Sequence, residues 1–208
     1  MSIAIAPRAA GAHVRRHTSL LAGAEKRTLV WIAHRLPDAV GSDRLSALGL
    51  GALVAAGVVL AAIPFGAWTA AGVIVCLVLN WFGDSLDGTL ARVRRQERPR
   101  YGYYVDHVID VIGIACLSAG LAASTLMSAL PALSFLAAYL LVSAESYLAT
   151  HATGVFRISY LGVGPTELRI LLAVGLLKAA ADPDVTIGGL GPLPLFDVGG
   201  WIAAELAA

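Results

Sequence analysis

The chain has 208 residues, of which 58% are hydrophobic and 14% are charged, and its formal net charge is +1. Soluble domains typically carry about 25% charged residues, so this composition excludes an ordinary soluble protein. No charged residue occurs between Leu45 and Gly83 or between Val111 and Ala144. Because runs of this length can cross about 30 Å of hydrocarbon as helices, we predict an integral membrane protein.

The N-terminal region is more polar than the rest of the chain. Residues 1–17 are expected to be a disordered N-terminus, and residues 18–42 to form an amphipathic juxtamembrane helix and a turn. Apolar residues such as Leu29 and Ile32 alternate with charged residues in this segment. It is too polar to span, so we expect it to lie on the cytoplasmic membrane surface.

Residues 43–208 are predicted to form one transmembrane domain. The fold class is all-α, with a bundle of about six transmembrane helices. The expected spans cover about 46–63, 67–92, 103–127, a fourth that follows a turn at Pro131 and ends near 154, 166–177, and a short sixth candidate from 193 to 208. Residues 178–193 are expected to be a loop on the far side of the membrane.

Basic residues gather before the first apolar run, after the second and after the fourth. Because Lys and Arg stay on the cytoplasmic side during insertion, the N-terminus and the loops near 93–102 and 154–166 should share that side. The same arginines could form a nucleic-acid patch. Insertion bias already explains them, so no nucleic-acid partner is expected.

Four aspartates interrupt the apolar stretches: Asp84, Asp87, Asp106 and Asp110. Ionisable groups in membrane helices cost roughly 2.5–3.5 kcal/mol each on insertion scales and usually mark function. The spacings of three and four residues place each pair on one helix face. The short connection at 93–102 predicts that the two helices are antiparallel neighbours and that the four carboxylates lie at one depth, near the cytoplasmic ends.

Converging carboxylates without partners would repel one another. Divalent cations such as Mg²⁺ would relieve this repulsion, since they prefer oxygen ligands and can share carboxylates in a two-metal site. Gly88 and Gly102 leave room for a nucleotide to approach the backbone, and Arg92 could bind a phosphate. The alternative is that the aspartates only pair with nearby arginines at the membrane surface.

Eight positions of this segment follow a fixed pattern: Asp84, Asp87, Gly88, Ala91, Arg92, Gly102, Asp106 and Asp110. The pattern resembles the signature of the CDP-alcohol phosphatidyltransferases. The resemblance implies that Asp84, Asp87 and Asp106 hold two Mg²⁺ or Mn²⁺ ions. Asp110 would also contact metal and would take the proton from the acceptor hydroxyl. The resemblance assigns the CDP site to Asp87, Gly88, Ala91, Arg92 and Gly102, with the arginine on the diphosphate.

The resemblance also implies a metal-dependent transfer of a phosphatidyl or phosphoalcohol group from a CDP-linked donor to a hydroxyl acceptor, with release of CMP, in phospholipid biosynthesis. CDP-diacylglycerol is the expected donor because the chain is short. An alternative is transfer of a headgroup from a soluble CDP-alcohol to a lipid, since Asp106-His107 is reminiscent of the choline and ethanolamine branch. The family commonly forms homodimers among membrane lipids, and we expect a bacterial cytoplasmic membrane with the site facing the cytoplasm.

Three further residues are candidates for the acceptor site: Glu145, Arg157 and Arg169. Glu145 could instead be structural, and Arg169 could be a membrane anchor or pair with Glu167. His107 is expected to be a packing residue, and Asn80 to orient a carboxylate or to hydrogen-bond a neighbouring helix. The sequence does not identify the acceptor: inositol phosphate, glycerol phosphate, serine and a second lipid are all compatible.

Other functions predict different patterns. A membrane prenyltransferase would place its aspartate motifs on well-separated helices. A divalent-cation transporter would need acidic groups near mid-membrane and a path to the far side, where these spans are apolar. A purely structural membrane protein should tolerate replacement of the aspartates.

Overall fold

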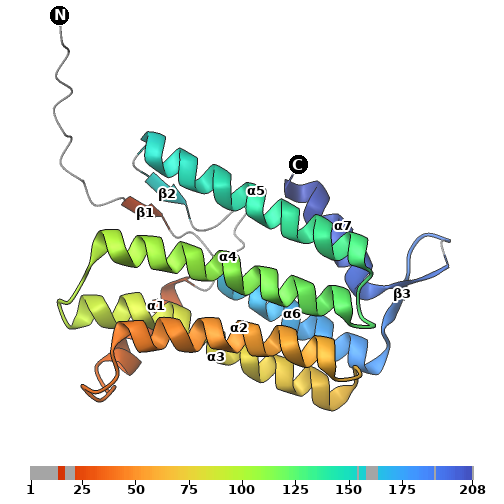
Figure 1. The fold of residues 1–208 in the computed structure, drawn as a ribbon, viewed down its shortest axis with the longest axis horizontal. Coiled ribbons are helices and arrows are strands. Elements are labelled where there is room, and N and C mark those ends of the chain that lie inside the picture. Colours follow the sequence, from red (N-terminus) through yellow and green to blue (C-terminus); the bar gives the residue numbers. More distant parts are fainter. Residues whose placement is uncertain (1–13, 17–21, 154, 158–163, 190, 208) are drawn as a thin grey trace, which may run out of the picture.

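The computed structural model describes residues 14–16, 22–153, 155–157, 164–189 and 191–207. The helices in this part of the chain are α1 (Ala22–Ala33), α2 (Ser42–Ala62), α3 (Ala67–Val93), α4 (Pro99–Ala123), α5 (Ala129–Thr153), α6 (Pro165–Ala181) and α7 (Leu195–Ala207). The strands are β1 (Val14–Arg16), β2 (Val155–Arg157), β3 (Asp184–Thr186) and β4 (Pro192–Pro194). The prediction of an all-α architecture is therefore confirmed apart from two small strand pairs (Figure 1).

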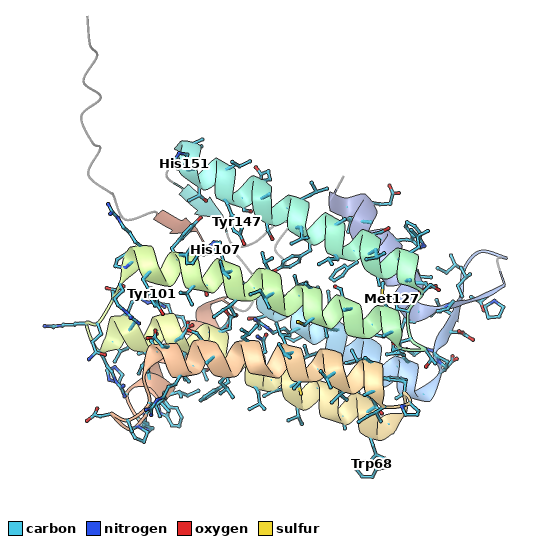
Figure 2. All side chains as sticks on the ribbon, viewed as in Figure 1. Trp68, Tyr101, His107, Met127, Tyr147 and His151 are labelled. Carbon is cyan, nitrogen blue, oxygen red and sulfur yellow. The ribbon has the colours of Figure 1, made fainter. Side chains whose placement is uncertain are left out.

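Four helices, α2 to α5, are long and apolar enough to cross a membrane. Their outward faces expose large aliphatic side chains such as Val58, Leu133 and Leu141, which in a soluble protein would be costly and which suit contact with lipid. Trp68, at the first turn of α3, is also exposed (Figure 2), as expected for a membrane-interface residue. The protein is an integral membrane protein.

The expected count of about six spans is not confirmed. The fifth and sixth expected segments form as α6 and α7, but α6 has 17 residues and α7 has 13. A 13-residue helix extends about 20 Å, which is shorter than the hydrocarbon core. Among the described residues, four helices thus meet the length and composition of a span.

Helix α2 is the centre of the bundle, because it packs against both α3 and α4. Helix α6 packs on α3, and α5 packs on α4 and α7. Helices α3 and α4 run in opposite directions, as expected (Figure 1). In the described part of the chain, however, they are not packed directly along their lengths. The prediction that they are immediate neighbours is therefore wrong, since α2 packs between them.

Glycines explain this central position of α2. A Cβ added to Gly83 of α3 would lie 2.6 Å from the backbone nitrogen of Gly49 in α2. A Cβ added to Gly120 of α4 would lie 2.6 Å from the Cα of Gly57, also in α2. Helices in membranes gain much of their packing energy where small residues let the backbones meet, and α2 has one such crossing with each neighbour.

Helix α1 is shorter than expected and is docked onto the bundle. The segment predicted to be helical over 18–38 forms a helix only over Ala22–Ala33. Leu29 and Ala33 are buried in a cluster with Leu45 of α2 and with Leu86 and Leu90 of α3. The apolar side of α1 thus packs against protein, and its expected place on the membrane surface stays a prediction.

Two helix boundaries differ from the expectation at prolines. The fourth span begins before Pro131, which lies in the first turn of α5 rather than in a preceding turn. Helix α4 likewise begins at Pro99, so Gly102 is helical. Both differences have one cause: the first turn of a helix needs no N–H from proline, and its fixed φ suits that position.

The short strands pair segments that were expected to be irregular. Strand β1 lies in the segment expected to be disordered, yet it pairs in parallel with β2, with Val14 opposite Val155. Strands β3 and β4 form an antiparallel pair within the predicted loop after α6. The remainder of residues 1–17 lies outside the described residues.

The α2–α4 crossing predicts a difference between two alanine substitutions in α2. Gly57→Ala should lower the midpoint of thermal unfolding in detergent, since its methyl would meet the Cys116 backbone, with the carbonyl carbon 2.9 Å away. Overpacking of this kind costs about 1–3 kcal/mol. The control is Gly51→Ala, where nothing lies within 4 Å, and it should leave the midpoint unchanged or slightly raised. Equal midpoints for both variants would contradict the close crossing.

Candidate active site

The four signature aspartates gather at one end of the bundle. Asp84 and Asp87 lie in the second half of α3, and Asp106 and Asp110 lie in the first half of α4. The two helix ends are joined by a short connection at residues 94–98 and lie at the same end of the bundle (Figure 1). The charges of Asp84, Asp106 and Asp87 all act on the partly buried carboxyl of Asp110. The fold thus brings both aspartate pairs within electrostatic range of one another.

The start of α2 holds Asp87 in place. The Ser46 hydroxyl donates to Asp87 Oδ2 at 2.5 Å, and the Ser42 hydroxyl donates to the Asp87 carbonyl oxygen at 2.7 Å. The Gly88 N–H donates to the other carboxylate oxygen, Oδ1. Hydrogen bonds to a charged acceptor are stronger than neutral ones, so these contacts fix the orientation of this carboxylate.

Asp84 is held by a cation from a different helix. Arg169 of α6 donates from Nη2 to Asp84 Oδ2 at 2.5 Å and from Nε to Asn80 Oδ1 at 2.7 Å. The Arg169 and Asp84 side chains are 14% and 22% exposed, respectively. Because the pair is largely removed from solvent, its attraction is weakly screened.

Asn80 connects this ion pair to α2. Its Nδ2 donates to the Gly49 carbonyl oxygen at 3.0 Å, while its Oδ1 accepts from Arg169. The expectation that Asn80 hydrogen-bonds a neighbouring helix is confirmed. Its carbonyl carries no charge, so it completes the guanidinium contacts without adding a second carboxylate beside Asp84.

The chemistry of the aspartates fits divalent metal ions, although they are not converged in this structure. Within the described residues, no three acidic, histidine or cysteine side chains lie close enough to hold one ion. Asp84 and Asp87 are instead satisfied by protein donors. A donor set of carboxylate oxygens without a thiolate is the set that Mg²⁺ and Mn²⁺ prefer. The assignment of these residues as metal ligands stays a prediction.

The expected CDP residues on α3 lie together. Arg92 is exposed, and its Nη2 donates to Thr89 Oγ1 at 3.0 Å. Its guanidinium lies over Gly88, where an added Cβ would be 3.4 Å from Nη1. Ala91 is partly buried beside them, and Gly102 of α4 is exposed with open space around it. Gly88 thus leaves room for the Arg92 guanidinium along the helix surface.

Of the three acceptor candidates, Arg169 is the one joined to an aspartate. Glu145 is exposed on α5, whereas the next residue, Ser146, is buried. Arg157 lies in β2, and its side chain falls outside the described part of the chain. Glu167, the expected alternative partner of Arg169, accepts from the backbone N–H of Gly164 at the start of α6.

Aromatic residues of α5 approach the aspartate end, and the sequence analysis did not identify them. Tyr139 and Tyr147 both interact electrostatically with Asp110. The Tyr147 ring meets the His107 ring edge-on with centroids 4.4 Å apart, between α4 and α5 (Figure 2). His107 is buried, as expected of a packing residue. The separation of eight residues, which puts both tyrosines on one helix face, was the signal available in the sequence.

The comparison with known families supports the same site. The family model for CDP-alcohol phosphatidyltransferase matches residues 44–205, which include every signature position. The chain belongs to the CDP-alcohol phosphatidyltransferase family. A search of curated proteins finds no match. Members of the family transfer phosphatidyl groups from CDP-alcohols in phospholipid synthesis and generally depend on divalent metal ions, so this protein is a membrane transferase.

The partly buried ion pair predicts a clear stability difference between two arginine variants. Removing one partner of a buried pair costs about 3–5 kcal/mol, and we expect Arg169→Gln to lower the free energy of unfolding in detergent by the low end of that range. The reason is that Asp84 would keep a charge without its counter-ion. The matched control is Arg98→Gln, whose partner Asp43 sits in an exposed pair, with side chains 53% and 57% exposed. That control should change stability by about 1 kcal/mol or less. Equal losses in the two variants would contradict the buried character of the Arg169–Asp84 pair.

Proposed function

We propose that the protein transfers a phosphatidyl group from CDP-diacylglycerol to a hydroxyl acceptor and releases CMP. Asp84, Asp87, Asp106 and Asp110 are proposed to hold two Mg²⁺ or Mn²⁺ ions. The observation that carries the proposal is the gathering of both aspartate pairs at one end of the bundle, within the part of the chain that matches the family. We also propose a homodimer in a bacterial cytoplasmic membrane, with the aspartates facing the cytoplasm.

The proposed reaction needs a base, a binding site for the diphosphate and charge stabilisation for the leaving group. Bound divalent ions would supply positive charge for the diphosphate and for the departing CMP. Asp110 would accept the proton of the acceptor hydroxyl. The hydroxyl oxygen then forms a bond to the phosphorus that carries the lipid, and the bond from that phosphorus to CMP breaks.

Other residues would orient the substrates. Arg92 would bind the diphosphate with its planar donors, next to the backbone at Gly88. Gly102 leaves open surface on α4 for the nucleotide, and Ala91 presents only a methyl group there. Arg169 is the acceptor candidate best supported by position, because it already lies at Asp84. Glu145 and Arg157 remain proposed acceptor residues.

Two alternatives make different predictions. Headgroup transfer from a soluble CDP-alcohol would use the same aspartates but would place the lipid on the acceptor. A divalent-cation transporter would not need the nucleotide. The position of the aspartates toward the joined ends of α3 and α4 favours the transferase over a transporter, which would need acidic groups near mid-membrane.

The base assignment is tested by Asp110→Asn. An amide cannot accept the hydroxyl proton, so transfer should fall by about 10²–10⁴-fold, whereas CDP binding should be largely preserved. Transfer is measured as CMP release, and binding as the CDP-dependent rise in the unfolding midpoint. Asp38→Asn is the control, because Asp38 is exposed in the turn after α1. Near-normal turnover in Asp110→Asn would show that another group removes the proton.

Metal removal and donor choice test the reaction as a whole. Purified protein with labelled CDP-diacylglycerol and a panel of acceptors should form labelled lipid and CMP, and a chelator should stop the reaction until Mg²⁺ or Mn²⁺ is restored. Labelled soluble CDP-alcohols with diacylglycerol form the parallel arm. Product in that arm alone would establish headgroup transfer, and metal transport into vesicles without CMP formation would establish the transporter.

A further inference from the structure

A carboxylate outside the family-matched region connects three helices beside Asp84. Glu25 of α1 accepts three hydrogen bonds on Oε1: from Trp81 Nε1 at 2.7 Å, from Thr166 Oγ1 at 2.8 Å and from Ser85 Oγ at 3.2 Å. Trp81 and Ser85 are one turn apart on α3, and Thr166 is in the first turn of α6. One oxygen atom of α1 therefore joins α3 to α6.

The residues that Glu25 binds adjoin those that form the ion pair. Trp81 and Ser85 directly follow Asn80 and Asp84 in the chain, and Thr166 precedes Arg169 by three residues. Residues three apart lie on the same side of a helix. Two neighbouring rows of α3 thus face α6: one row binds Arg169 directly, and the other binds Thr166 through Glu25.

This arrangement constrains how α6 sits on α3. The ion pair alone is a single contact at the end of a long, flexible side chain. The Glu25 contacts fix the α6 backbone one turn earlier, since threonine has a short, stiff side chain. With both contacts made, Arg169 reaches Asp84 from a defined direction.

The other oxygen of Glu25 strengthens the case that the residue has a specific role. Glu25 Oε2 is buried and has no hydrogen-bond partner within the described part of the chain. A carboxylate in such surroundings is expensive, and neither apolar packing nor membrane attachment of α1 requires one. The cost is offset by three donors that converge on a single atom.

We infer that Glu25 is a positioning residue for the transfer reaction, which acts through Thr166 and Ser85 on the Arg169–Asp84 pair. Helix α1 is then part of the framework of the site, in addition to any contact with the membrane. Glu25 lies before residue 44, where the family match begins, so the signature does not contain this role. The inference rests on the proposed function, because it assigns Asp84 to the site.

The test compares Glu25→Ala with Glu25→Gln in the full chain. Glutamine keeps an oxygen that can accept from Trp81, Ser85 and Thr166, whereas alanine leaves all three donors without it. We expect Glu25→Ala to lower kcat about ten-fold or more, because a small misplacement of reacting groups has a large effect on rate. The KM for the acceptor should change by less than about two-fold. Glu25→Gln should recover most of the lost kcat.

A second readout does not depend on turnover. Binding of Mn²⁺, followed by the loss of the free-ion electron paramagnetic resonance signal, should require several-fold more metal in Glu25→Ala, since Asp84 is less well oriented. Thr166→Val, which removes only the α6 donor, should shift Mn²⁺ binding in the same direction. Lys26→Ala, a change at an exposed neighbour on α1, is the matched control and should behave as the unmodified protein.

Three results would overturn the inference: unchanged kcat and Mn²⁺ binding in Glu25→Ala, equal impairment of Glu25→Gln and Glu25→Ala, or a loss confined to the unfolding midpoint. Equal impairment would mean that charge, not hydrogen-bond geometry, is what matters. The unmodified protein separates this inference from the proposed function. If it forms no CMP and binds no Mn²⁺, the proposed function fails, whatever the variants do.

Discussion

The contact of bare helix backbones at two crossings in α2 is the constraint on which the rest of the structure depends. At Gly49–Gly83 the α3 helix comes close enough for Asn80 to reach the Gly49 carbonyl. At Gly57–Gly120 the α4 helix is held on another face of α2. These crossings set the separation of the two aspartate-bearing helices, because α3 and α4 meet mainly through α2. Side chains at either crossing would push apart the halves of the site.

The second requirement is to keep charge inside the membrane domain without an unpaired group. Asp84 achieves this with one arginine and one neutral amide, and Asp87 with two serines and a backbone N–H. Each carboxylate is held from a helix other than its own: α6 for Asp84 and α2 for Asp87. The order within the site is therefore tertiary, and the signature segment by itself does not supply it.

The sequence predicted the features that depend on local pattern. Uncharged runs located α2 to α5, and the aspartate spacings located the site, since both follow from helix periodicity and the cost of burying charge. It failed where distant segments meet. That Arg169 would bind Asp84 rather than Glu167, that α2 would separate α3 from α4, and that Glu25 would accept from Thr166 all depend on packing between residues far apart in the chain. The glycines of α2 were visible, but nothing local assigned each one to a particular neighbour.

The pairings made by the N-terminal segment also bear on how the protein is synthesised. Glu25 and Thr166 are 141 residues apart, and β1 must likewise wait for β2. At roughly 5–20 residues per second, a ribosome needs about 7–28 s to travel from one partner to the other. During that interval four spans enter the bilayer while the first helix lacks its final partners. Chaperones or the insertion machinery would meet this helix before the bundle does, and the last stage of folding is its return to a site assembled without it.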